Sequence, residues 1–281
     1  MASAAKPSIL DRWADRFGRL TGRRDDVRRP PPRKILYVHV AKAGGSSFNL
    51  VLHRYFHGES HCEQYVEQRQ KPGGGFVREL GNLEILRRLD FLSGHLTLPL
   101  LEHSGLDLHD YMRVTILRHP FMQSISHMKW VIKISEDEAA PLYQNVSSEV
   151  QQMSQALRAV DEWSPQTVMR WLELYPHWFQ NNQARYFLTS DSLQEEALVE
   201  KLSGLDLVGV TERLDAFVTR FARLTGLGRQ VRATGVPHEN RNPAYHVPLA
   251  VLEDTALRDF LTVYNRFDMA LYAHAEKHLA P

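Results

Sequence analysis

Short apolar runs alternate with amphipathic segments along the chain. Nearly continuous apolar runs at 35–40, 112–117 and 205–211 predict strands that are covered on both faces, and a shorter run at 91–92 predicts a fourth. Between these runs, apolar residues recur every three or four positions, which is the spacing of one helix face. Strands that alternate with helices predict an α/β fold, in which a parallel sheet carries helices on both faces.

The same spacing sets the expected helices and loops. The first helix is expected to begin near Ser46 or Ser47, and a later one to have Thr211 as its N-cap. Further helices are expected at 80–89, 120–132, 163–187 and 249–279. Polar stretches and stretches rich in glycine or proline are expected to form loops at 71–76, 136–152 and 232–248.

Composition narrows the class of protein. The chain of 281 residues has 43% hydrophobic and 24% charged residues, as soluble globular proteins do. Residues 1–33 are expected to form a basic, proline-rich arm, and residues 34–281 a single domain. No apolar run approaches the roughly 20 residues that cross a bilayer, so no integral membrane segment is expected. The arginines of the arm leave peripheral contact with a membrane open.

Charge and cysteine content disfavour other classes. The net charge of +1 produces no overall positive potential that would attract nucleic acid, so nucleic acid is not expected as a partner. Cys62 is the one cysteine, so an intrachain disulfide and a multi-cysteine zinc site are excluded. The fourteen histidines are scattered; His57 and His61 have helical spacing, but no H-E-x-x-H pattern occurs, and no metal site is expected. The sequence leaves the oligomeric state open.

The residues between the first strand and the first helix carry the clearest chemistry. They read Val40-Ala-Lys-Ala-Gly-Gly-Ser-Ser47. Glycines in a strand-to-helix turn let backbone N–H groups and the helix dipole converge on an anion, and Lys42 adds a positive charge. We therefore expect a P-loop-like phosphate site. A Walker A loop has its lysine after the glycines, whereas Lys42 precedes Gly44 and Gly45, which argues against an ATPase or GTPase. An ordinary glycine turn is the alternative.

Two further polar groups follow predicted strands. His95 comes after the short strand at 91–92, and Arg118 comes after the strand at 112–117. Ligands of such sheets bind beyond the carboxyl ends of the strands, so both side chains are expected near the phosphate loop. Ser126 lies two helical turns beyond Arg118, and the two are expected to hold a second phosphate. A structural salt bridge is the alternative for Arg118.

Taken together, these motifs resemble those of sulfotransferases that use 3′-phosphoadenosine-5′-phosphosulfate (PAPS), in the branch of the heparan and uronyl 2-O-sulfotransferases and their bacterial relatives. Residues 40–47 resemble the P-K-T-G-G-T-S loop for the 5′-phosphosulfate, and residues 118–126 resemble the R-x-P-x-x-R-x-x-S motif for the 3′-phosphate. Short segments at 182–185, 208–212 and 238–240 also resemble motifs of these sulfotransferases. In two departures, Ala41 replaces the usual proline and Gln123 stands where arginine is common.

The resemblance implies a PAPS-dependent O-sulfotransferase that moves a sulfuryl group by in-line displacement to a hydroxyl of a carbohydrate or glycolipid, releases 3′,5′-ADP and needs no metal. The Golgi members of this branch have a membrane anchor, and since none is expected here, we expect a cytoplasmic, bacterial enzyme. Lys42 would stabilise the leaving oxygen, and His95 would take the proton of the acceptor hydroxyl. The residues implied in donor binding are Lys42, Ala43, Gly44, Gly45, Ser46, Ser47, Arg118 and Ser126.

Several alternatives remain at this stage. His119 and His127 compete with His95 as the base, and Arg185 and Asn240 are either nucleotide contacts or parts of the scaffold. The identity of the acceptor and the position that is sulfated stay open. A catalytically silent protein that binds 3′,5′-ADP or another nucleotide is the alternative function, and a P-loop small-molecule kinase is a more remote one.

Overall fold

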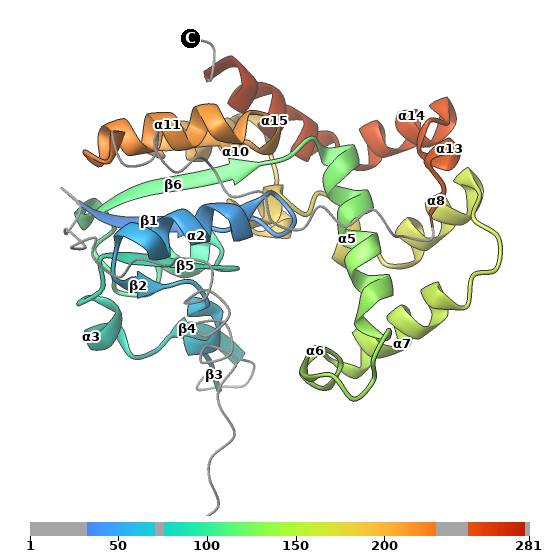
Figure 1. Ribbon diagram of the computed structural model, residues 1–281, viewed down its shortest axis with the longest axis horizontal. Helices are drawn as coiled ribbons and strands as arrows, with labels where there is room; N and C mark the ends of the chain where they lie inside the picture. Colours follow the sequence, from blue (N-terminus) through green and yellow to red (C-terminus); the bar gives the residue numbers. More distant parts are fainter. Residues whose placement is uncertain (1–32, 71–75, 229–246, 279–281) are drawn as a thin grey trace, which may run out of the picture.

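A computed structural model gives the fold and describes residues 33–70, 76–228 and 247–278 (Figure 1). The expected arm, apart from Arg33, lies outside the described residues. So do the glycine-rich loop at 71–75 and nearly all of the loop expected at 232–248, with Asn240.

The centre of the structure is a five-stranded sheet in which every neighbouring pair of strands is parallel. The strands lie in the order β2-β5-β1-β6-β7. Their bounds are β1 Lys34–Val38, β2 Gly58–Glu59, β5 Phe91–Gly94, β6 Tyr111–Leu117 and β7 Leu207–Val210. The α/β prediction is confirmed, and the four strands expected from the apolar runs are all present, each within a few residues of its expected bounds.

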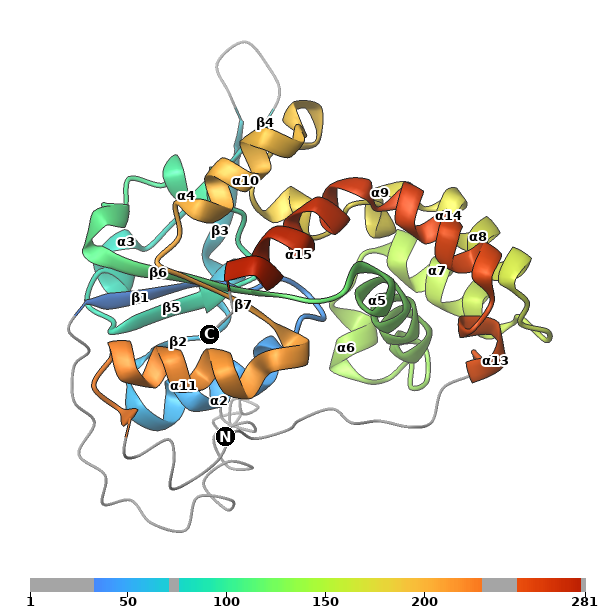
Figure 2. The ribbon, with the colours of Figure 1, turned by 90° about the horizontal axis from the view of Figure 1, so that it is seen from above.

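Helices cover both faces of this sheet (Figure 2). Because side chains alternate along a strand, Ile35 and Tyr37 point to one face and Leu36 and Val38 to the other. The first face packs against α2 Gly45–Tyr55 and α11 Leu214–Leu224, and the second against α4 Leu98–Glu102, α10 Glu195–Ser203 and α15 Arg266–His278. These four strand side chains are at most 1% exposed, and the three aliphatic ones each contribute about 1.5–3 kcal/mol of burial free energy.

A layer of helices lies beside the sheet, on the right of Figure 1. It has its own apolar core, which contains no strand residue. Helix α5 joins the two parts, because it begins at Pro120 directly after β6 and packs along the helical layer. The layer consists of α5 Pro120–Ile134, α6 Pro141–Gln144, α7 Ser148–Arg158, α8 Pro165–Leu174, α9 Pro176–Phe179, α13 Leu249–Leu252 and α14 Thr255–Tyr264.

Two sequence predictions about helices and loops are wrong, and a third, on Thr211, follows below. The helix expected at 80–89 is reduced to α3 Leu83–Leu86, because residues up to Leu80 form a hairpin of β3 Val66–Gln70 and β4 Phe76–Leu80. The loop expected at 136–152 contains all of α6 and the first turn of α7. Ser147 caps α7, because its hydroxyl accepts a hydrogen bond from the Val150 amide.

Thr211 is not the N-cap of α11. The helix begins at Leu214, and the Thr211 hydroxyl donates to the carbonyl of Leu117 at 3.0 Å, which ties the ends of β7 and β6 together. Short 3₁₀ turns complete the described chain at η1 Cys62–Tyr65, η2 Leu108–Asp110, η3 Ala184–Tyr186, η4 Ser190–Ser192 and η5 Thr211–Arg213. His57 and His61 do not share a helix, since α2 ends at Tyr55.

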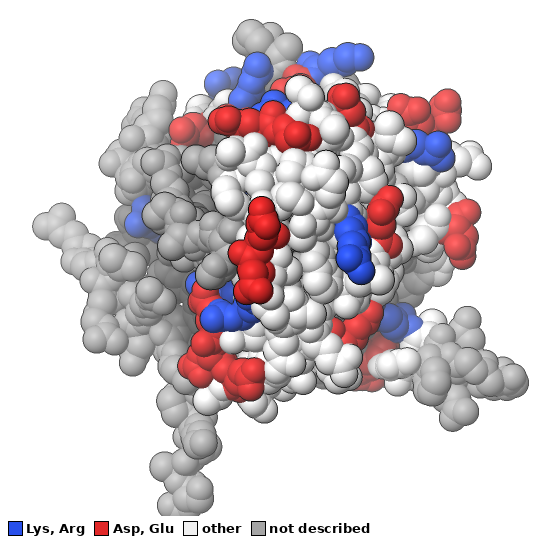
Figure 3. All heavy atoms as spheres, turned by 90° about the vertical axis from the view of Figure 1, so that its right-hand side faces the viewer, with Lys and Arg blue, Asp and Glu red and all other residues white. Residues whose placement is uncertain are grey.

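The outer face of the helical layer is weakly charged. Figure 3 shows acidic and basic side chains scattered over it, with broad uncharged areas between them. Leu174 of α8 and Val263 of α14 are 59% and 75% exposed. Within the described ranges, no helix combines the length and apolar character that a membrane span requires.

Candidate active site

Three of the predicted site residues lie at the same edge of the sheet. The loop after β1 carries Lys42, His95 follows β5, and Arg118 follows β6. Parallel strands bring their carboxyl ends to the same edge, so three segments that are far apart in sequence converge. Thr211, at the end of β7, closes this edge against Gly44: a Cβ atom on Gly44 would lie 3.3 Å from its methyl carbon.

The loop after β1 makes a tight turn with left-handed backbone at two positions. Lys42 has a φ of 64° and Gly44 a φ of 80°, both in the left-handed region. A lysine there costs of order 1 kcal/mol or more, and such strain gathers at functional sites. Helix α2 begins after Gly44 with no side-chain cap and no acidic residue in its first turn. The N-cap residue, Gly44, thus offers no capping side chain, and the amides at the start of α2 carry the positive end of the helix dipole.

Gly45 is required by its neighbour His39. A Cβ atom at position 45 would lie 1.9 Å from Nε2 of His39, a contact that no side chain tolerates. The His39 ring thus lies over the start of α2. Burial, followed by the charges of His95, His61 and Lys42, holds the pKa of His39 well below its usual range, so the ring is neutral.

Lys42 and Arg118 form a pair of cations. One guanidinium nitrogen of Arg118 donates to the Lys42 carbonyl at 3.1 Å, and both side chains are half-buried. Burial lowers the pKa of Lys42 to about 8, with help from Arg118 and Lys133. Burial also lowers the pKa of Arg118, against an opposite effect of Glu212. Neither cation forms an ion pair with a carboxylate among the described residues. An anion would complement both.

The backbone of Arg118 is fixed by a buried amide. Gln183 accepts from the Arg118 N–H at 2.9 Å and donates to its carbonyl at 2.8 Å. The next link is Asp268 of α15, whose carboxylate accepts the backbone N–H groups of Gln183 and Ala184 at 3.1 and 2.7 Å. Burial raises the pKa of Asp268 to about 7, against the effect of those two hydrogen bonds. Segment 183–186 is thereby held against both β6 and α15.

His95 is the exposed imidazole of the site, and its tautomer follows from its contacts. Its Nδ1 lies 2.9 Å from the carbonyl oxygen of His39, which can only accept a hydrogen bond. Nδ1 therefore carries the proton, and Nε2 presents a lone pair. The rings of His39 and His95 are 4.4 Å apart between centroids. A neutral imidazole with a free Nε2 is the form that a general base needs.

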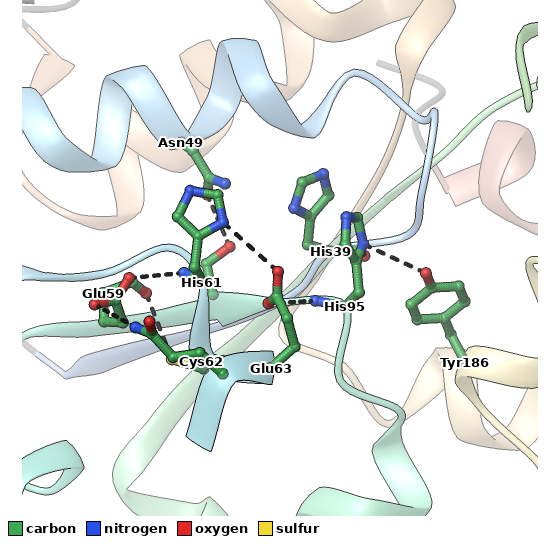
Figure 4. A network of polar contacts seen from close by, with 10 residues as sticks. His39, Asn49, Glu59, His61, Cys62, Glu63, His95 and Tyr186 are labelled. Atoms are coloured by element: carbon green, nitrogen blue, oxygen red, sulfur yellow. Dashed lines mark hydrogen bonds and ion pairs between the residues drawn. The ribbon is translucent and has the colours of Figure 1, made fainter. Parts of the chain in front are cut away.

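A carboxylate holds the backbone of His95. Glu63 accepts its N–H at 3.1 Å, and the other Glu63 oxygen lies 3.6 Å from Nδ1 of His61 (Figure 4). A Cβ on Gly94 would lie 2.4 Å from the Glu63 carboxylate, so glycine is needed before His95. Burial alone would raise the pKa of Glu63, but the contact with His61, the charge that His95 carries when protonated and the hydrogen bond from the His95 N–H leave that pKa below its usual value.

The competing bases occupy other surroundings. His127 is 5% exposed, lies among Trp130, Trp178 and Phe179, and has its pKa lowered by burial to about 3. The ring of His119 packs against Tyr272, 5.2 Å away between centroids. Of the three histidines, His95 is the one that the structure exposes.

Other predicted residues divide between site and scaffold. Arg185 is a scaffold residue, because its guanidinium donates to the carbonyls of Pro176, His177 and Gln180. Ser126 is half-buried on α5, and its hydroxyl has no hydrogen-bond partner among the described residues; no contact joins it to Arg118. Ala43 and Ser47 are buried, whereas Ser46 is half-buried at the start of α2.

Gln123, where the resemblance leads one to expect arginine, supports the loop. Its amide nitrogen donates to the Ala41 carbonyl at 3.1 Å and to the side-chain oxygen of Asn182 at 3.0 Å. Gln123 is 1% exposed, so its role is to fix the backbone next to Lys42.

Sequence reasoning missed four residues that shape the site: His39, Glu63, Gln183 and Tyr186. His39 directly precedes the motif at 40–47, Gln183 lies within the motif at 182–185, and Tyr186 directly follows it. No sequence pattern predicts a role for Glu63, since it contacts His95 from a 3₁₀ turn that lies in no motif.

A cavity of about 140 Å³ lies at the opposite edge of the sheet, where β7 begins, and is not part of this site. Its lining includes Asp206, Arg220 and His274. In the comparisons with known proteins, neither a protein-family model nor a curated protein matches the chain.

Proposed function

We propose that the protein is a PAPS-dependent O-sulfotransferase that acts on a hydroxyl of a carbohydrate or glycolipid. The observation that supports this most is the pair of half-buried cations, Lys42 and Arg118, which lack a carboxylate partner among the described residues; the Arg118 guanidinium donates to the backbone carbonyl of Lys42 at 3.1 Å. His95 follows the neighbouring strand β5 at the same edge of the sheet, and its Nε2 has no hydrogen-bond partner among the described residues. An anionic donor and a base-assisted transfer use all three groups.

On the donor side, the residues of the loop hold and stabilise phosphate charge. The amides of residues 45–47, at the start of α2, would bind the 5′-phosphate, together with the hydroxyl of Ser46. Arg118, with Ser126 on the following helix, would bind the 3′-phosphate. Lys42 would donate to the oxygen that leaves sulfur, where negative charge grows in the transition state.

On the acceptor side, His95 would act as general base. The acceptor hydroxyl oxygen forms a bond to sulfur as the bond between sulfur and the 5′-phosphate oxygen breaks. Nε2 of His95 takes the hydroxyl proton, while the Nδ1–H group stays hydrogen-bonded to the His39 carbonyl. The products are the sulfated acceptor and 3′,5′-ADP. The role of Lys42 needs its protonated form, which the bound dianion would stabilise.

The test is transfer of radiolabelled sulfate from PAPS into a mixture of carbohydrate and glycolipid acceptors, followed by mass spectrometry of the product. Lys42→Ala should abolish transfer, whereas Lys201→Ala should not, since Lys201 pairs with Glu102 elsewhere on the surface. His95→Ala should lower turnover strongly and leave the affinity for 3′,5′-ADP nearly unchanged. His103→Ala is the matched control, because its Nδ1 also contacts a backbone carbonyl, 2.6 Å away.

The outcome separates the alternatives. Binding of 3′,5′-ADP with no transfer to any acceptor would replace the proposal by a silent nucleotide-binding protein. Magnesium-dependent consumption of ATP would replace it by a kinase. Wild-type turnover in His95→Ala would remove the assignment of the base.

A further inference from the structure

We propose that Tyr186 is a positioning residue, which couples the loop that carries Lys42 to the imidazole of His95. The inference rests on the proposed function, because it concerns the same transfer reaction. It assigns to the Tyr186 hydroxyl the task of holding the donor side and the base side of the site in one geometry.

The hydroxyl of Tyr186 contacts both sides. Its oxygen accepts the backbone N–H of Ala41, the residue before Lys42, at 3.2 Å. The same oxygen lies 3.4 Å from Nδ1 of His95 (Figure 4). Since Nδ1 carries a proton toward the His39 carbonyl, the Tyr186 oxygen is a second, weaker acceptor for that proton. One oxygen atom therefore bridges two segments that follow different strands.

Tyr186 is well placed to act as a fixed point. It ends η3, and Asp268 holds the backbone N–H groups of Gln183 and Ala184 just before it. The neighbouring Phe187 is fully buried. The ring of Tyr186 meets that of His95 edge to face, with 6.5 Å between centroids. Ordering these groups before the reaction avoids reorganisation during it.

The hydroxyl works as a neutral group. Burial raises the pKa of Tyr186 to about 12, with the hydrogen bond from Ala41 acting in the opposite direction. Tyr186 is therefore not the base. When Nε2 of His95 takes the acceptor proton, the ring becomes a cation and its Nδ1–H becomes a stronger donor, so the His39 and Tyr186 oxygens stabilise it more than they stabilise the neutral ring.

Tyr186→Phe removes only the bridging oxygen. We expect kcat to fall about three- to tenfold, as the loss of one such hydrogen bond implies, while KM for PAPS changes less than about twofold. Tyr264→Phe is the matched control, because its hydroxyl donates to the Leu172 carbonyl at 2.6 Å in the helical layer. That variant should lose stability without losing turnover.

Combining the change with His95→Ala shows through which group Tyr186 acts. If Tyr186 acts through His95, the double variant should match His95→Ala within about twofold. A further drop of about three- to tenfold in the double variant, as large as the effect of Tyr186→Phe alone, would assign the effect to the loop alone and overturn the proposal. An unchanged kcat in Tyr186→Phe would overturn it as well.

NMR of the histidine rings separates failure of this inference from failure of the proposed function. In the wild-type protein we expect the His95 Nδ1 proton to be protected from exchange with solvent, and in Tyr186→Phe to exchange faster. Equal exchange in both proteins would refute the positioning role, whether or not sulfate is transferred. Absence of transfer by the wild-type protein would refute the proposed function, and the exchange rates would still decide the role of Tyr186.

Discussion

The lowered pKa of Lys42 predicts that the proposed nucleotide binding depends on pH. Burial, with the nearby charges of Arg118 and Lys133, lowers this pKa to about 8 in the free protein. A bound phosphate dianion stabilises the ammonium and raises the pKa again. Binding of 3′,5′-ADP near pH 8 should therefore take up a proton, and the affinity should be highest below pH 8 and fall as the pH rises through it.

The size of the effect follows from the pKa of about 8. Roughly nine-tenths of the Lys42 side chains are protonated at pH 7, one half at pH 8 and one tenth at pH 9. The affinity for 3′,5′-ADP should thus weaken about tenfold between pH 7 and pH 9, and about half a proton should be taken up at pH 8. The phosphates do not contribute, because a phosphate monoester loses its second proton near pH 6.

Isothermal titration calorimetry at these three pH values, in two buffers with different ionisation enthalpies, measures both quantities. Lys42→Arg is the control, since a guanidinium stays protonated throughout the range. It should bind with an affinity that is nearly constant with pH. Equal wild-type affinity at pH 7 and pH 9, or the same slope in Lys42→Arg, would refute the reasoning.

Three further changes test the scaffold of the site. Gly45→Ala should destabilise the fold by about 1–3 kcal/mol through its clash with His39, and adding His39→Ala should restore stability; an unchanged thermal midpoint would contradict this. Gln183→Ala leaves both backbone groups of Arg118 without their partner and should cost about 2–4 kcal/mol in urea unfolding. Burial raises the pKa of Asp268 from its usual value of 3.8 to about 7, so the protonated carboxyl stabilises the folded state. This stabilisation is complete below pH 3.8 and is lost as the pH rises through 7. The thermal midpoint of the wild-type protein should fall over this range, and that of Asp268→Asn should lack this trend.

The sequence predicted the sheet better than the helices around it. Residues 112–117 and 205–211 are mostly apolar because both faces of the sheet are covered, so the sequence predicts their strands clearly. The hairpin up to Leu80 was missed, since its polar residues, such as Glu67 and Arg78, have no apolar alternation. Helix α7 was missed because its buried face is only Val150, Met153, Ser154 and Leu157 within a polar stretch.

For the site, motif order identified residues at strand ends, and topology brought Lys42, His95 and Arg118 together as expected. What sequence could not supply is the contacts between distant segments. The Tyr186 hydroxyl lies near His95 only because Asp268, more than eighty residues later, holds its segment. Arg185 likewise serves the scaffold because its guanidinium donates to three carbonyls of α9 and its C-cap residue, which the sequence does not place next to it.

The central claim is that Lys42 and Arg118 bind the two phosphates of one nucleotide. Its most direct test is calorimetric comparison of 3′,5′-ADP with 5′-AMP on the wild-type protein and on Arg118→Ala. We predict that the wild-type protein binds 3′,5′-ADP about 10- to 100-fold more tightly, as a charge-assisted contact to the second phosphate implies, and that Arg118→Ala loses most of this preference. Equal affinity of the wild-type protein for both nucleotides would contradict the claim.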